Sequence, residues 1–220
     1  MFFTNREEAG RLLAARLEKF RDRNPVILAL PRGGLPVGYE IATTLDAPLD
    51  IILVRKIGAP GSPELAAGAV VDGDHPELIL NQEVISILNI PDDYLEDRKK
   101  QQLIEIERRR ELYLAGRPPI GVEDRTAIVV DDGVATGSTV RAAVHALKRR
   151  KPKQVVIAVP VAPPDTARQL AQEADEVICL DTPDPFYAIG VFYQDFAQLT
   201  DEDVIHILKM AEEKQPGPSE

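Results

Sequence analysis

The distribution of apolar and polar positions along the chain predicts alternating strands and helices. Short continuous apolar runs, typical of strands buried on both faces of a sheet, occur at 26–30, 50–56, 65–71, 125–132, 153–161 and 175–180. Apolar residues recur at helical spacing over about 5–22, 36–45, 91–117, 138–150, 162–174 and 200–215. This alternation predicts right-handed crossovers and an α/β fold with a mainly parallel central sheet flanked by helices.

Glycine, proline and charge refine this picture. The segment 59–64, APGSPE, is too rich in Gly and Pro to continue a strand, so we expect a loop there. The segment 91–117 mixes apolar residues with many charges, which predicts a long solvated amphipathic helix, and its basic cluster 108–110 is balanced by neighbouring glutamates. With 220 residues and 44% hydrophobic residues, one domain over 1–220 is expected, with 216–220 frayed.

Charge and cysteine content exclude several classes of function. A formal net charge of −10 at pH 7 argues against a protein that coats nucleic acid, since that work needs a basic face. No apolar run reaches the length of a membrane span, and the N-terminus lacks the pattern of a secretory signal. The single cysteine, Cys179, allows no disulfide framework, and the three histidines lack metal-ligand spacing. We therefore expect a cytoplasmic protein that binds neither nucleic acid nor membranes.

The segment 127–139, AIVVDDGVATGST, joins a predicted strand to a predicted helix and carries the most specific chemistry in the chain. In open parallel sheets, ligands bind beyond the carboxyl ends of strands, where helix N-termini present unpaired N–H groups to anions. The small residues here let backbone amides approach a phosphate closely, and three hydroxyls add donors. Asp131 and Asp132 would repel that phosphate at contact distance, so they indicate ligand hydroxyls or a divalent metal nearby. A sugar phosphate satisfies both requirements.

This segment resembles the phosphoribosyl pyrophosphate motif of type I phosphoribosyltransferases over its whole length. The stretches LALPRGGLPVGYEIA, ILVRKIGAPGSPELAAGAV and PFYAIGVFYQDF are similar to a branch of that family, so the resemblance covers most of the chain. One departure is Gly133, where many members carry a bulkier residue. The resemblance implies the type I fold with a small hood lobe, here built from a helical insertion at about 74–118 and from about 182–200.

The resemblance also implies a role for each part of the site. Asp131 and Asp132 would bind the ribose 2′ and 3′ hydroxyls. The 5′-phosphate would be bound by Ala135, Thr136, Gly137, Ser138 and Thr139, and the pyrophosphate by Pro31, Arg32, Gly33 and Gly34. Members of the family often have a strained cis peptide in the latter loop, here at Leu30–Pro31 or at Arg32–Gly33.

A mobile loop that closes over the reacting centre in the family corresponds to 55–66. Its cations Arg55 and Lys56 are the candidate catalytic residues, because negative charge grows on the departing pyrophosphate. Mg²⁺ is the implied cofactor, held mainly by the substrate with no direct protein ligand required. Stacking of the acceptor base would fall to aromatic residues after the last strand, namely Phe186, Tyr187, Phe192 and Tyr193.

The implied activity is transfer of 5-phosphoribosyl from phosphoribosyl pyrophosphate to a nitrogenous base, or the reverse pyrophosphorolysis. The sequence lacks both GxxxxGK[ST] and a GxGxxG after its first strand, which argues against a P-loop enzyme and a Rossmann dehydrogenase. The alternative is a regulator with the same fold that senses phosphoribosyl pyrophosphate or a nucleotide without turnover. A homodimer is compatible with the resemblance.

Overall fold

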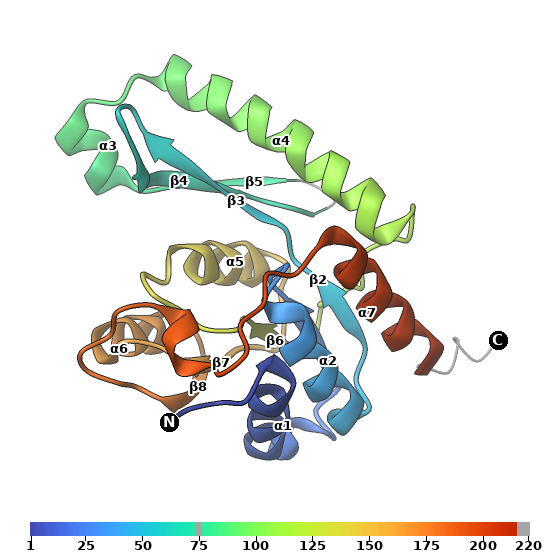
Figure 1. The fold of residues 1–220 in the computed structure, drawn as a ribbon. Helices are drawn as coiled ribbons and strands as arrows, with labels where there is room; N and C mark the ends of the chain where they lie inside the picture. The colour runs from blue at the N-terminus through green and yellow to red at the C-terminus, as the bar shows by residue number, and fades with distance from the viewer. Residues whose placement is uncertain (74–75, 215–220) are drawn as a thin grey trace.

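A computed structural model describes residues 1–73 and 76–214 (Figure 1). These residues form two lobes, and the chain passes from the main lobe to the small lobe just after strand β2 (Leu49–Ile51). The main lobe is built on a five-stranded sheet of order β2-β1-β6-β7-β8, in which every neighbouring pair is parallel. The small lobe (residues 54–114) has a three-stranded antiparallel sheet, β3-β4-β5, with two helices. The predicted α/β fold with a mainly parallel sheet is therefore confirmed.

The elements of the main lobe follow the predicted alternation. Its strands are β1 (Pro25–Ala29), β2 (Leu49–Ile51), β6 (Thr126–Val130), β7 (Gln154–Val161) and β8 (Glu176–Asp181). Its α-helices are α1 (Arg6–Leu17), α2 (Gly34–Leu45), α5 (Ser138–Arg149), α6 (Pro164–Glu173) and α7 (Asp201–Lys214). Short 3₁₀ turns, η1 (Glu18–Phe20) and η2 (Ile189–Phe192), follow α1 and β8.

Successive side chains of each main-sheet strand point to opposite faces of the sheet, so each strand contributes to two hydrophobic cores. Ile27 of β1 packs with residues of α1, α2 and α7 on one face. Its neighbours Val26 and Leu28 pack with α5 and α6 on the other face. Because both faces are covered by helices, the central strands carry the continuous apolar runs seen in the sequence.

The small lobe differs from the prediction in its limits and its content. It consists of β3 (Val54–Ala59), β4 (Ser62–Val71), β5 (Glu77–Leu80), α3 (Gln82–Leu88) and α4 (Asp92–Leu114). The apolar run 50–56 is split between two sheets, and 59–64 is a tight hairpin in which Ala59 pairs with Ser62. The lobe therefore begins at Val54 rather than near 74, and a β-sheet forms much of it.

Residues 182–200, which we expected in the hood, lie instead on the main lobe (Figure 1). Phe192 and Tyr193 form a small aromatic core with Phe3 and Val161 there. The predicted fraying of 216–220 and the last residue of the helix at 200–215 lie outside the described residues. Within the described part of the chain, no helix is both long enough and apolar enough to cross a membrane.

Candidate active site

Two loops at the carboxyl edge of the main sheet are in direct contact. Strands β1 and β6 are neighbours, so the loop at 31–34 and the loop that begins at Asp131 meet at the same edge. A Cβ on Gly33 would lie 2.1 Å from Oδ2 of Asp132, and a Cβ on Gly34 would lie 2.6 Å from the carbonyl oxygen of Val130. Glycine is needed at both positions because the second loop fills the space of a side chain.

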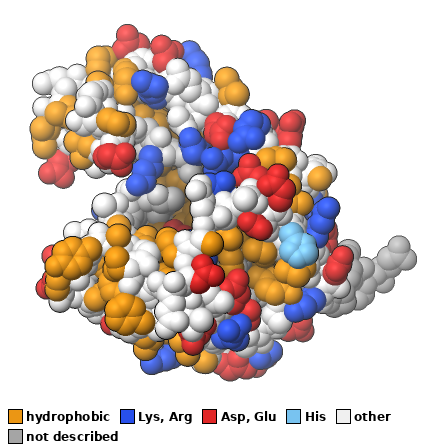
Figure 2. Space-filling model, in the orientation of Figure 1, with side chains coloured by type: hydrophobic (Ala, Val, Ile, Leu, Met, Phe, Trp, Pro, Cys, Tyr) orange, Lys and Arg blue, Asp and Glu red, His pale blue; other side chains and the backbone are white. Residues whose placement is uncertain are grey.

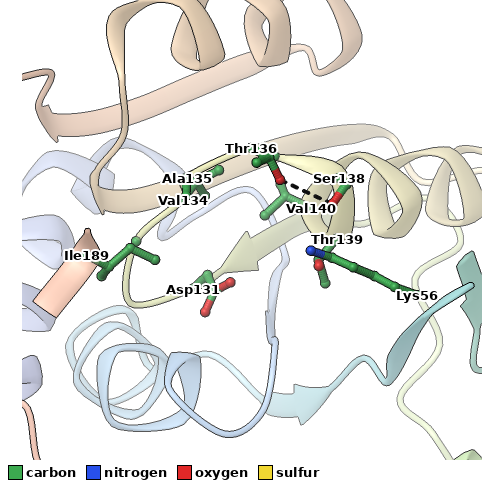
Figure 3. Close-up of a pocket in the computed structure, with 11 residues that line it drawn as sticks. Lys56, Asp131, Val134, Ala135, Thr136, Ser138, Thr139, Val140 and Ile189 are labelled. Carbon is green, nitrogen blue, oxygen red and sulfur yellow. Dashed lines mark hydrogen bonds between the residues drawn. The ribbon is translucent and has the colours of Figure 1, made fainter. Parts of the chain in front are cut away.

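The loop between β6 and α5 borders a cavity of about 170 Å³ (Figure 3). Gly137, with φ at +76°, precedes the first residue of α5, and the first residues of that helix, whose amides lack partners within the helix, line the cavity. The hydroxyl of Thr166 donates to the carbonyl oxygen of Ala135 at 2.8 Å and fixes the loop from α6. The predicted phosphate residues, Ala135, Thr136, Gly137, Ser138 and Thr139, all line this cavity.

The two acidic residues that follow β6 have different surroundings. Asp131 lines the cavity, and its Oδ1 accepts a hydrogen bond from the amide of Asp132 at 2.9 Å. Burial first, and then the neighbouring Asp132, raise the pKa of the Asp131 carboxyl well above its ordinary value. Asp132 turns into the main lobe, where its Oδ2 accepts a hydrogen bond from Nε of Arg6 at 2.8 Å. Burial raises the pKa of Asp132 as well, against the opposing effect of Arg6.

Arg6 is a buried partner that the sequence did not suggest. Its side chain and that of Asp132 are 10% and 11% exposed. The Nη1 group donates to the carbonyl oxygen of Ala197 at 2.9 Å, and the guanidinium lies 3.8 Å from the ring centre of Phe196. The hydroxyl of Tyr193 donates to the carbonyl oxygen of Asp132 at 2.6 Å. Helix α1 and the segment after β8 therefore hold the second acidic residue from two sides.

The two predicted catalytic cations, Arg55 and Lys56, are successive residues of β3 and line different cavities. Lys56 borders the cavity beside the loop between β6 and α5, and its side chain extends toward Thr139 (Figure 3). Arg55 borders a second cavity of about 250 Å³ together with Pro31, Asp131 and Thr139. Arg109 of α4 lines this second cavity as well, although the sequence had indicated only a solvated helix there. Asp131 and Thr139 thus line both this cationic cavity and the cavity beside the loop between β6 and α5.

The loop at 31–34 carries the one non-proline cis peptide bond among the described residues, between Pro31 and Arg32. Neither of the two positions considered from the sequence, Leu30–Pro31 and Arg32–Gly33, is correct. The side chain of Arg32 lies 3.7 Å from Asp201 of α7, measured from Nη1 to Oδ1. Of the four residues proposed for pyrophosphate, Pro31 lines the cationic cavity directly, and Gly33 brings the loop against Asp132.

The aromatic residues proposed for the base do not line the cavity beside the loop between β6 and α5. Phe192 and Tyr193 are 8% and 6% exposed in their small core. Phe186 packs on Phe192 with ring centres 5.3 Å apart, while Tyr187 is 81% exposed. Of the segment after β8, Ile189 lines the cavity. It was not predicted from the sequence because only aromatic residues were considered for the base.

A third cavity of about 370 Å³ continues from the first between the lobes. It shares Lys56 and Ser138 with that first cavity and is bounded by the small-lobe sheet, α3 and α5. Figure 2 shows the cleft between the two lobes on one face of the molecule. Among the described residues, no three His, Cys, Asp or Glu side chains are grouped as a metal site. Asp131 is the carboxylate that faces both smaller cavities.

Comparison with known proteins gives this arrangement a family. The family described as "Phosphoribosyl transferase domain" matches residues 4–196. Two Mycobacterium tuberculosis proteins, from strains CDC 1551 and H37Rv and each named "Putative phosphoribosyl transferase", are 42% identical over 209 residues, 95% of this chain and 47% of each relative. The chain thus spans about half the length of these curated relatives. The crystal structure of TT1426 from Thermus thermophilus is 43% identical, covers 94% of this chain and 98% of its own, and has a TM-score of 0.83. The chain belongs to the phosphoribosyl transferase domain family.

Proposed function

We propose that the chain is a Mg²⁺-dependent phosphoribosyltransferase that moves the 5-phosphoribosyl group of phosphoribosyl pyrophosphate to a nitrogenous base, or runs the reverse pyrophosphorolysis. The observation that carries this proposal is the position of Asp131. It lies between a cavity with an anion-binding loop and a cavity with two arginines. A ribose that carries a phosphate at one end and a diphosphate at the other matches this order of charges.

Each group of the substrate has a matching part of the site. The 5′-phosphate accepts hydrogen bonds from the amides and hydroxyls of residues 135–139 at the N-terminus of α5. The ribose hydroxyls donate to the carboxylate of Asp131. The diphosphate lies against the loop at 31–34 and the guanidinium of Arg55. Asp132, already bound to Arg6, orients the loop and the neighbouring carboxylate, so Asp131 takes the larger share of the contact with ribose.

The reaction breaks the bond between the anomeric carbon and the diphosphate oxygen, and the electron pair leaves with the diphosphate. Positive charge then develops on the sugar ring, and negative charge grows on the leaving group. Arg55 lines the cavity assigned to the diphosphate and stabilises the leaving group most strongly at that moment, and Lys56 adds positive charge from the adjoining cavity. A nitrogen of the acceptor forms the new bond to the anomeric carbon, and its proton passes to solvent.

Mg²⁺ fits the residues present. The carboxyl of Asp131 has a raised pKa because burial and Asp132 disfavour its charge, and a nearby cation relieves that cost. When bound, Mg²⁺ neutralises the phosphoryl oxygens and is held mainly by the substrate, since it retains several ligands that do not come from protein. The chain's own part is to orient the carboxylate and to keep the diphosphate between cationic side chains.

The test combines binding with turnover. Ribose 5-phosphate is titrated calorimetrically into the wild type, into Asp131→Asn and into a control, Asp97→Asn, whose side chain is 74% exposed on α4. We expect micromolar binding to the wild type and the control, and a roughly tenfold or larger loss for Asp131→Asn, because one charge-assisted contact is removed. Equal affinities for all three proteins would contradict the role of Asp131.

Turnover is measured as pyrophosphate release from phosphoribosyl pyrophosphate and Mg²⁺ with a panel of purines, pyrimidines and other amines. Release with at least one acceptor is expected, and it should be lost in the Arg55→Ala, Lys56→Ala double variant. Intact binding with no release across the panel would instead support the nucleotide-sensing regulator. The presence of Arg55 and Lys56 at two adjoining cavities favours the enzyme, because a sensor has no leaving group to stabilise.

A further inference from the structure

Three successive arginines on α4 have three different environments. Successive helical residues are rotated by about 100°. Arg108 is 54% exposed and pairs with Glu105 on its own helix. Arg110 lies 3.5 Å from Asp72 of the small lobe, measured from Nη1 to Oδ1. Arg109 lines the cationic cavity that also contains Arg55. The basic cluster 108–110, whose charge is balanced by glutamates in the sequence, therefore points in three directions, and Arg109 is the member that lines the cavity.

Arg55 and Arg109 are like charges held together in a partly buried place. Burial first, and then the charge of Arg109, lower the pKa of Arg55. The side-chain hydrogen bond of Arg55 goes to Oε1 of Gln102, a neutral acceptor, at 3.0 Å. Arg109 donates to the carboxylate of Glu105, which also accepts from Arg108. Within the described residues, Arg55 forms no ion pair, and the carboxylate paired with Arg109 is also paired with Arg108. Another carboxylate, that of Asp131, lines the cavity of the two arginines.

A polyvalent anion would relieve this repulsion, and Pro31 of the main lobe also lines the cavity. We propose that Arg109 binds the diphosphate group of the substrate together with Arg55, an inference that rests on the proposed function. The small lobe then contributes two guanidinium groups, from β3 and α4, and the main lobe contributes the loop at 31–34. One bound diphosphate touches both lobes.

The chain offers a matched control for this proposal. Arg109→Gln and Arg108→Gln remove the same charge from adjacent residues, and both native side chains bind the same carboxylate of Glu105. Inorganic pyrophosphate and ribose 5-phosphate, each with Mg²⁺, are titrated separately into the two variants and the wild type. The midpoint of thermal unfolding is measured without ligand.

We expect Arg109→Gln to bind pyrophosphate roughly ten- to a hundredfold more weakly, with unchanged affinity for ribose 5-phosphate, while Arg108→Gln matches the wild type for both. The ligand-free Arg109→Gln variant should melt no lower than the wild type, because repulsion with Arg55 is removed; a purely structural arginine would give a lower midpoint. Equal pyrophosphate affinity in the two variants, or equal loss of both ligands in Arg109→Gln, would overturn the assignment. Failure of the wild type to bind ribose 5-phosphate would count instead against the proposed function.

Discussion

Replacing each of the two adjacent aspartates with asparagine should change stability in opposite directions. Asp131→Asn removes a charge that burial and Asp132 disfavour, and the introduced amide oxygen can still accept the hydrogen bond from the Asp132 amide. Asp132→Asn removes the charge that compensates the buried guanidinium of Arg6. The two changes have the same size and shape, so a difference in sign reports the charge environment alone.

The magnitudes follow from these surroundings. Two like charges 4 Å apart repel by roughly 4 kcal/mol at the effective dielectric of a protein surface, which is an upper bound for the acidic pair. Arg6 attracts both carboxylates and offsets part of this repulsion, so Asp131→Asn should raise the free energy of unfolding by about 1 kcal/mol. Breaking the buried pair by Asp132→Asn should lower it by about 3 kcal/mol. For a chain of this size, the shifts in Tm are roughly +3 °C and −10 °C.

The difference between Asp131→Asn and the wild type should depend on pH in a defined direction. The folded-state pKa of Asp131 is raised, so the wild type gains stability when this carboxyl is protonated. The advantage of the variant is therefore full above the folded pKa and disappears as pH falls toward the unfolded value of about 3.9. Urea unfolding of both proteins between pH 4 and pH 8 measures it. A loss of stability in Asp131→Asn at neutral pH, or similar losses in both variants, would refute the reasoning that the charge of Asp131 is unfavourable while the charge of Asp132 is needed by Arg6.

Three further substitutions test how the loops are held. Gly33→Ala places a Cβ 2.1 Å from Oδ2 of Asp132, so we expect a loss of about 3 kcal/mol in urea unfolding as the buried pair is displaced; unchanged stability would contradict the close loop contact. Gly137→Ala forces a residue with φ at +76° to carry a side chain, which should cost about 1–2 kcal/mol and weaken ribose 5-phosphate binding in calorimetry. Thr166→Val removes the hydrogen bond to Ala135 and should lower stability by about 1 kcal/mol with weaker ribose 5-phosphate binding, whereas full affinity would show that α6 does not fix the loop.

The parts of the structure that follow from local sequence were predictable. A buried strand followed by small residues and a helix specifies the loop at 131–139 within a single stretch of chain, and the apolar runs identified the strands of the main sheet. The junction between the lobes was not predictable in this way. Ile52 and Leu53 are 3% and 2% exposed between two strands of different sheets, so hydrophobicity stays continuous where the chain changes direction. A periodic pattern records burial and carries no information on which sheet a residue joins.

The missed residues of the site share a different cause. Arg6 and Arg109 look like surface charges because each lies on an amphipathic helix, and a long polar side chain on such a helix is usually solvated. Their functional neighbours are distant in the sequence, since 126 positions separate Arg6 from Asp132. In the sequence, a solvated charge cannot be distinguished from a buried charge whose partner is distant along the chain.

The acidic pair shows how far a motif can be interpreted without that fold. Asp131 and Asp132 are adjacent, and the motif treats them as equivalent ribose ligands. At the end of a strand, however, successive side chains point to opposite sides, so one carboxylate reaches the cavity and the other reaches the interior. The interior carboxylate is tolerable because Arg6 compensates it, and this compensation lowers the cost of keeping a second carboxylate next to it. Arg6 therefore reaches the candidate site through Asp132, and in the proposed function it is a positioning residue although it does not line the cavity.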